Sequence, residues 1–470
     1  MEPRTAPSSL STFAPAFMAS FICSSVIIMI LSRRLLPFTV DPARTDSKHA
    51  YYRTRASQSP NPSAVGPRRP TLCRMDLRRR SLRAARVSDE SHRVTTFELF
   101  FDLVFVFAFT QVTGFMAHEH SFLGVLQGMI ILAMLWWSWV AYSWLGNQTH
   151  VDEGLMRLGL SVVMVAMFIA ALAIPEAFDD LEGGLSGPFV LALAYFVVRA
   201  MHLLLYLYAA RGDGPLQRQV LKLSLVMVPG AALILTGAVI GGTAQTWLWA
   251  AGLALDIALT YLTSTGGNWR LLSAAHWTER HGLVVILALG ESIVAIGVGA
   301  SQEPVSIPIL LGAVFGIALS VCLWWLHFDV TAIAAEHRFA ALHGPERISA
   351  AVDAYSYLHL PLVAGIILSA FGVEDVLAHV FDTADFGLLG SVALFGGAAL
   401  FLIGSSAFWR RMAGSWRKLR LVGAAVLLLV VPAGALLAPL AALALAAALA
   451  VVLVAAETAL DAGTRASIRE

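Results

Sequence analysis

Acidic side chains stand inside a long apolar stretch that begins near residue 97. Glu98 and Asp102 are four residues apart, so a helix would carry both on one face, with Gln111 further along it. An ionisable group within an apolar helix is costly, and by default it marks either a functional site or a structural pairing. Carboxylates placed in this way could bind a cation or relay protons.

The second half of the chain repeats this mixture and adds histidines. Its candidate side chains are Glu279, His281, Glu291, His327, Asp329 and His359. Carboxylates and imidazoles near one membrane face could line a water-filled cavity, relay protons, or act as general acid and base. The structural alternative is that they cap helix ends, reach lipid headgroups or hydrogen-bond to neighbouring side chains.

A metal site is a narrower possibility for some of these groups. Donor atoms would have to converge to about 2 to 2.5 Å from one ion, and the sequence spacing does not indicate this for Asp102, His281, His327, Asp329 and His359. The three cysteines show no metal-binding spacing, and the chain has neither a P-loop nor a dinucleotide fingerprint. We therefore expect no metal and no cofactor.

Arg199 is the basic residue farthest from any charged loop. It lies 11 residues into an apolar stretch that starts at 188, which is about 16 Å deep at a rise of about 1.5 Å per residue. An unpaired guanidinium at that depth costs on the order of 2.5 to 3.5 kcal/mol. Asp256 and Glu291 lie equally deep in their own stretches, so we expect Arg199 to pair with one or both. Such a pair is either a static packing device or a place where a substrate or proton competes.

The elements that must position these residues are transmembrane helices. Apolar residues make up 58% of the 470 positions, charged residues 13%, and the mean hydropathy is +0.73, which excludes an ordinary soluble domain. Apolar windows of about 20 residues span a bilayer as helices. They predict an all-α integral membrane protein with about twelve spans, near 97–116, 121–145, 155–174, 188–210, 220–240, 246–263, 281–300, 306–329, 355–373, 386–409, 419–437 and 440–460.

Charge in the loops predicts how these helices are oriented. Alternate loops lack Lys and Arg entirely, and the remaining loops and ends are basic, which places both termini in the cytoplasm. Residues 1–93 form a basic arm that we expect to be largely disordered, with 15 Lys/Arg against 5 Asp/Glu between 33 and 93. The arm would attract anionic lipid headgroups, with no nucleic acid as partner. Translation could start at Met75, within this arm.

Features of the hydrophobic part recur in order at nearly constant spacing. Glu98 near the start of the first predicted helix corresponds to Glu279 near the start of the seventh, and the tryptophan pair at 136–137 corresponds to the pair at 324–325. Six helices per half is an even number, so two such repeats would run parallel. The halves would cover residues 94–275 and 276–470.

Two blocks resemble the signatures of the bacterial low temperature requirement protein A (LtrA) family. They are Phe97–Ala108, FELFFDLVFVFA, and Glu279–Val294, ERHGLVVILALGESIV. The resemblance spans roughly residues 90 to 460 and implies a multi-pass bacterial membrane protein. It supplies neither a reaction nor site residues.

Three functions from different classes fit these features. A transporter or permease for a small solute or protons, in the bacterial inner membrane, is favoured by the parallel repeat with buried charges at mid-depth. A membrane-embedded enzyme acting on lipid would use the acids and histidines as an acid-base or metal set. A non-catalytic membrane-adaptation protein is the third. A deep cavity between the halves would favour transport, and a shallow pocket gathering the acids and histidines would favour the enzyme.

Overall fold

The computed structural model describes residues 87–264, 269–301 and 303–462, and this part of the chain is almost entirely helical. Its one pairing of β type is an isolated antiparallel bridge between Val87 and Thr149. The α-helices are α3 (Thr96–Glu119), α4 (Phe122–Gln148), α5 (Gly154–Leu172), α6 (Gly187–Ala209), α7 (Gly214–Ile240), α8 (Gly242–Ser264), α9 (Ala274–Ser301), α10 (Ile307–Phe328), α11 (Thr331–Ala341), α12 (Gly344–Ala350), α13 (His359–Ala378), α14 (Gly387–Ser391), α15 (Gly397–Ala413), α16 (Lys418–Gly434) and α17 (Pro439–Leu460).

The predicted helical membrane architecture is confirmed. Within the described residues, eleven helices are long and apolar enough to cross a membrane. The remaining predicted span, 419–437, corresponds to α16, which has 17 residues with Pro432 inside it. The observed helix starts differ most from the predicted ones where a polar side chain caps the N-terminus of the helix. α7 begins at Gly214 rather than 220, because the Asp213 side chain accepts the Leu216 N–H at 3.1 Å.

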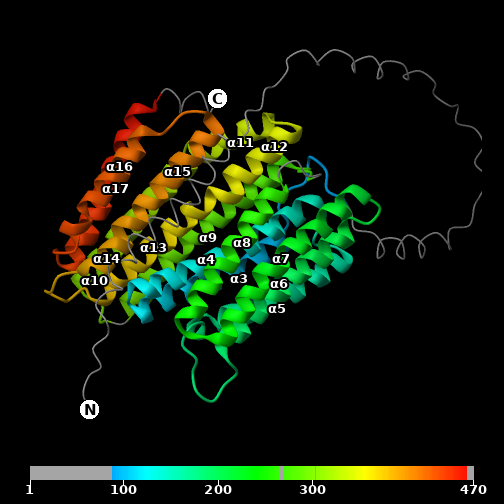
Figure 1. Ribbon diagram of the computed structural model, residues 1–470. Coiled ribbons are helices and arrows are strands. Elements are labelled where there is room, and N and C mark those ends of the chain that lie inside the picture. Colours follow the sequence, from blue (N-terminus) through cyan, green and yellow to red (C-terminus); the bar gives the residue numbers. More distant parts are fainter. Residues whose placement is uncertain (1–86, 265–268, 302, 463–470) are drawn as a thin grey trace, which may run out of the picture. The chain divides into compact units, whose positions relative to one another are not determined.

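Two helices form the interior of the bundle. Every residue of α4 from 130 to 143 is buried, and so is every residue of α13 from 365 to 373. α3 packs against α4, α5 and α9, and α13 packs against α9 and α15. Figure 1 shows α16 and α17 at one edge of these helices, beside α10 and α15, with α5, α6 and α7 at the other edge. A polar side chain on α4 or α13 therefore meets protein on all sides.

Glycines allow the closest helix contacts, but not all of those that the sequence suggested. Spacing predicted close packing at Gly290, Gly297, Gly312 and Gly316. An added Cβ at Gly312 or Gly316 would meet a side-chain carbon at 2.6 or 2.9 Å, whereas nothing lies within 4 Å at Gly290 or Gly297. The packing prediction is thus wrong for Gly290 and Gly297, because that face of α9 meets no neighbour close enough to fill the space.

Two spans are interrupted by π-helical turns, η2 (Ala351–Tyr357) and η3 (Val392–Gly396). In η2 the Leu358 N–H donates to the carbonyl of Asp353, five residues back, at 3.1 Å. π-turns are rare and occur frequently at functional sites. η2 leads directly into α13, so it sets which side chains this span presents to α8 and α4.

Ion pairs gather where α3 begins and α4 ends. Arg347 of α12 donates to Glu90 at 3.1 Å, and Arg411 of α15 donates to Asp353 at 2.8 Å. The segment 87–93 is held here as well, since the Ser273 hydroxyl donates to the carbonyl of His92 at 2.8 Å. The ordered body therefore includes the last seven residues of the predicted arm. Residues 1–86, Met75 among them, lie outside the described part.

The internal repeat stays a prediction. Trp136 and Trp137 are buried, at 1% and 6% exposure, while Trp324 and Trp325, their proposed counterparts, are 44% and 39% exposed. If the two halves derive from one unit, these tryptophan pairs have taken different roles, a packing role in α4 and a surface role in α10.

Candidate functional site

Glu98 sits in the first turn of α3 and is fully engaged by its neighbours. The Thr95 side chain caps the helix by accepting the Glu98 N–H, and Glu98 in return accepts the Thr95 N–H at 2.9 Å, which is a capping box. Its other carboxylate oxygen lies 2.9 Å from Nε2 of His276 on α9. The first predicted carboxylate thus joins α3 to α9.

Asp102, one turn further, is paired across the same helix contact. Arg280 of α9 donates to Asp102 Oδ2 at 2.8 Å, and the Trp139 indole of α4 donates to Oδ1 at 3.0 Å. Arg280 also donates to the carbonyl of Glu98 at 3.2 Å. Both members of the ion pair are 1% exposed. Asp102 and Arg280 therefore tie α3, α4 and α9 together.

Three side chains beside this network stand close enough to suggest an ion site. Within the described residues, His92, Glu98 and His276 form a group whose possible ligand atoms all lie within 4.8 Å of one another. The five residues considered for metal from the sequence do not form such a group in this part of the chain. The His92 and His276 rings stack with centroids 4.7 Å apart. Burial, with His276 adjoining, lowers the pKa of His92 to about 4.

Asn147 decides how His276 is protonated. Its Oδ1 accepts the Leu272 N–H at 2.7 Å and its Nδ2 donates to the Ser273 carbonyl at 2.7 Å, which fixes the amide orientation. Nδ2 then faces His276 Nδ1 at 3.4 Å, so Nδ1 is the acceptor and Nε2 carries the proton toward Glu98. The nitrogen that faces Glu98 is thus occupied by a hydrogen bond. This geometry favours a structural role for His276, as a hydrogen-bond bridge between Asn147 and Glu98, over a role as a metal ligand. Asn147 is wholly buried, so the glycosylation sequon that it begins is inaccessible.

The predicted histidines of α9, α10 and α13 do come together. The ring of His281 lies 5.3 Å from that of His359, and the ring of His327 lies 5.8 Å from that of His359, measured between centroids. All three are buried. His281 and His359 each donate Nδ1–H to a carbonyl in their own helical turn, at 2.9 and 3.0 Å. Asp329 does not join them; it follows α10 and lines a separate small cavity with Arg420.

Arg199 meets an acid at equal depth, as expected. Its Nη2 donates to Asp256 Oδ2 of α8 at 2.7 Å, and both side chains are 5% exposed. Thr260, one turn along α8, donates to the other Asp256 oxygen at 3.3 Å. Glu291, the alternative acid, takes a different partner, the Thr110 hydroxyl of α3, at 2.5 Å.

The two remaining candidates lie apart from Arg199. Glu279 accepts the Val94 N–H at 3.2 Å and so helps to hold the segment before α3. Gln111 is half-buried on α3. The predicted residues consequently divide among several places, and of all of them only Arg199 lines the cavity described next.

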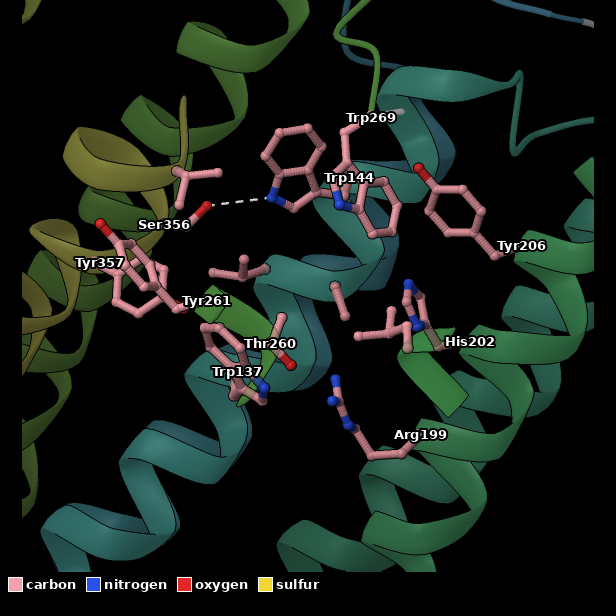
Figure 2. A pocket seen from close by; sticks show the side chains of 14 residues that line it. Trp137, Trp144, Arg199, His202, Tyr206, Thr260, Tyr261, Trp269, Ser356 and Tyr357 are labelled. Atoms are coloured by element: carbon pink, nitrogen blue, oxygen red, sulfur yellow. Dashed lines mark hydrogen bonds between the residues drawn. The ribbon is translucent and has the colours of Figure 1, made fainter. Parts of the chain in front are cut away.

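A cavity of about 590 Å³, counting its open side, lies between α4, α6, α7, α8 and η2. Half of the lining side chains are aromatic rings, His202 included, and Figure 2 shows Arg199 directed into the cavity below Trp137 and His202. None of the fourteen side chains that line it is a carboxylate.

Several hydrogen-bonding groups around this cavity are buried without a partner among the residues that the structure describes. They are Nε of Arg199, the indole N–H groups of Trp137 and Trp269, the hydroxyl of Tyr206 and the ring nitrogens of His202. Trp144, on the same wall, is satisfied, because its indole donates to the Ser356 hydroxyl at 3.2 Å (Figure 2). Buried polar groups in folded proteins are nearly always paired with protein or ordered water, so this cavity offers hydrogen-bonding groups to water or to a ligand.

Sequence reasoning missed much of this arrangement. Arg280 was grouped with the basic residues that orient loops, although it stands four positions from His276 and so shares its helix face. In the sequence, the tryptophans of α4 are typical of an interfacial belt or of helix packing; in the structure Trp137 lines the cavity. No pattern in the sequence pointed to Tyr206 or Trp269.

Helices, buried ion pairs and an internal cavity together define a polytopic α-helical membrane protein. A sequence model of the bacterial low temperature requirement A protein (LtrA) family matches residues 93–455, and the chain belongs to this family. The chain is 29% identical over 332 residues to an uncharacterized protein of Rhizobium meliloti (strain 1021), which covers 68% of this chain and 77% of that relative. No solved structure is significantly similar to this chain.

Proposed function

We propose that this protein transports a small solute across the bacterial inner membrane and binds it in the cavity beside Arg199. The observation that carries the proposal is the Arg199–Asp256 ion pair at the cavity wall, 2.7 Å long and 5% exposed on either side. Ionisable groups buried within transmembrane helices mark substrate and ion pathways by default.

The position of the cavity supports transport. Arg199 is 12 residues beyond Gly187, the first residue of α6, or about 18 Å along the helix axis at about 1.5 Å per residue, so the guanidinium lies near mid-membrane. The walls come from α4, α6, α7 and α8 on one side and from η2 on the other. Transporter sites lie typically near the midplane between repeats, at irregular helical turns.

The arrangement of the other candidates argues less well for an enzyme. A lipid-modifying enzyme would gather its acids and histidines around one pocket at headgroup level. Here Glu98 and Asp102 are engaged with His276 and Arg280, and the histidine cluster is buried among aromatic rings. A non-catalytic scaffold would have no use for unpaired donors around a cavity.

Reconstitution in proteoliposomes tests the proposal. Proton flux would be followed with an internal pH dye, and labelled organic acids, amino acids and monovalent cations would be offered in separate uptake assays. We expect the double variant Arg199→Gln/Asp256→Asn to fold but to lose uptake, because both charges are removed together and neither is stranded. The matched double variant Arg270→Gln/Asp213→Asn removes a more exposed pair of 2.9 Å and should transport normally. Full uptake by the folded Arg199→Gln/Asp256→Asn protein would contradict the proposal.

A further inference from the structure

We infer that the ligand of this cavity is a small organic carboxylate with a flat, apolar body. The inference rests on the proposed function for its site, but it concerns ligand binding and is tested by binding affinity alone. It follows from the charge, the hydrogen-bonding groups and the shape of the wall.

The first step is charge. Of the fourteen lining side chains, Arg199 is the one Lys, Arg, Asp or Glu; its partner Asp256 does not line the cavity, so the charged group that faces the ligand space is a guanidinium donor. Asp256 engages a single terminal nitrogen of the guanidinium, and Nε has no partner. A guanidinium carries five N–H donors in a planar fork, and two adjacent ones match the two oxygens of a carboxylate. The Nε edge therefore remains for an anionic ligand.

The second step is the excess of donors. The indoles of Trp137 and Trp269 can donate a hydrogen bond but cannot accept one, and neither has a partner. Only a ligand that brings acceptor oxygens can satisfy them together with Nε of Arg199. A carboxylate is a small organic group that offers several acceptor positions in one plane, and its oxygens bind a guanidinium more strongly than neutral acceptors do.

The third step is the remaining wall. Val140 and Leu223 contribute apolar surface, and the rings of Trp137, Trp144 and Tyr206 stand around the same space (Figure 2). Flat surfaces of this kind suit an aromatic ring. An aromatic cage can also hold a quaternary ammonium, but such a group carries no acceptor and would leave the unpaired N–H groups of the wall without a hydrogen bond.

A set of probes built on one ring tests the ligand class. Binding to the full chain in lipid nanodiscs would be measured by calorimetry and tryptophan fluorescence for benzoate, benzamide, benzyl alcohol and phenyltrimethylammonium, with acetate as a carboxylate that lacks the ring. We expect benzoate to bind at least tenfold more tightly than each of the others. Equal affinity of benzoate and benzamide, or tighter binding of phenyltrimethylammonium, would overturn the inference.

Variants that keep the fold locate the site. Trp137→Phe and Tyr206→Phe each retain a ring and remove one unpaired polar group, and we expect each to weaken benzoate about tenfold. Trp249→Phe is the matched control, because the indole of Trp249 already donates to the carbonyl of Ile234 at 2.9 Å and its side chain does not line the cavity; benzoate affinity should be unchanged. Equal effects of all three substitutions would refute the assignment. If benzoate binds in nanodiscs but never enters proteoliposomes, the ligand class is supported and transport of benzoate is contradicted. If another solute is taken up and benzoate does not bind, transport is supported and the ligand class is contradicted.

Discussion

At the scale of single residues, Arg280 concentrates more contacts than any sequence pattern suggested. Its guanidinium satisfies a carboxylate and a backbone carbonyl of α3, and it lies 5.3 Å from the ring centre of Trp139 on α4. A charge that is held in this way is stable only while its partner remains. Losing one member strands the other in a medium that solvates it poorly.

Replacing Arg280 with Gln should therefore destabilise the protein by about 3 to 5 kcal/mol, because Asp102 is left as a buried, unpaired charge. Thermal unfolding of the detergent-solubilised protein would measure the loss. Arg270→Gln breaks a pair of similar length in which Arg270 is 57% exposed, and it should cost no more than about 1 kcal/mol. Similar losses for the two variants would show that burial of the Arg280 pair contributes nothing.

Protonation of His92 should make the free energy of unfolding depend on pH. Its pKa is about 4 in the folded chain against 6.5 ordinarily, so the unfolded chain binds the proton first on acidification. Stability is then fully present above about pH 6.5 and is lost as the pH falls toward 4, by roughly 1 to 3 kcal/mol. His150, His276 and Glu98 also face this ring, so the test is the difference between wild type and His92→Asn across pH 7 to 4. Parallel stability curves for the two proteins would rule out the effect.

At the scale of elements, the contact between α13 and α15 depends on missing side chains. A Cβ at Gly365 would stand 2.5 Å from the backbone nitrogen of Phe401, which cannot move without its helix. We expect Gly365→Ala to cost about 1 to 3 kcal/mol in thermal unfolding, since the helices must separate. Gly290→Ala meets nothing within 4 Å and should be neutral, or stabilising by up to about 1 kcal/mol through helix propensity. Equal costs at the two positions would mean that helix separation is not the cause.

The elements were easier to predict from sequence than the site, for a physical reason. Length and hydropathy place a span, and depth along the span predicted that Arg199 needs an acid. The depth of a residue along its span does not distinguish Asp256 from Glu291 as the partner, because depth does not indicate which helices are neighbours. Trp137 and Trp269 were invisible as ligand-facing donors, since tryptophan serves equally in packing and at interfaces. The π-turn η2 left no signal in apolar periodicity.

At the scale of the whole molecule, the helix order places the connections between helices on two faces. The α5–α6 connection lies at the opposite end of the bundle from α11 and α12 (Figure 1). A reporter after Glu182, in that connection, should be external, and one after Arg417, just before α16, should be cytoplasmic, because basic loops remain inside. Protease accessibility in spheroplasts would read out both. Finding both on one face would contradict the predicted topology.

The α9 partners of the two α3 carboxylates also arrive late in the synthesis of the chain. His276 is 178 residues beyond Glu98, and Arg280 is 178 beyond Asp102. At about 5 to 20 residues per second, a ribosome needs roughly 9 to 36 s to supply them. During that interval Glu98 and Asp102 of α3 lack these two partners, which makes stable insertion of α3 into the bilayer less favourable. A nascent chain that ends before α9 should consequently leave α3 poorly integrated, and the helix should become fixed in the bilayer only when synthesis has passed residue 280.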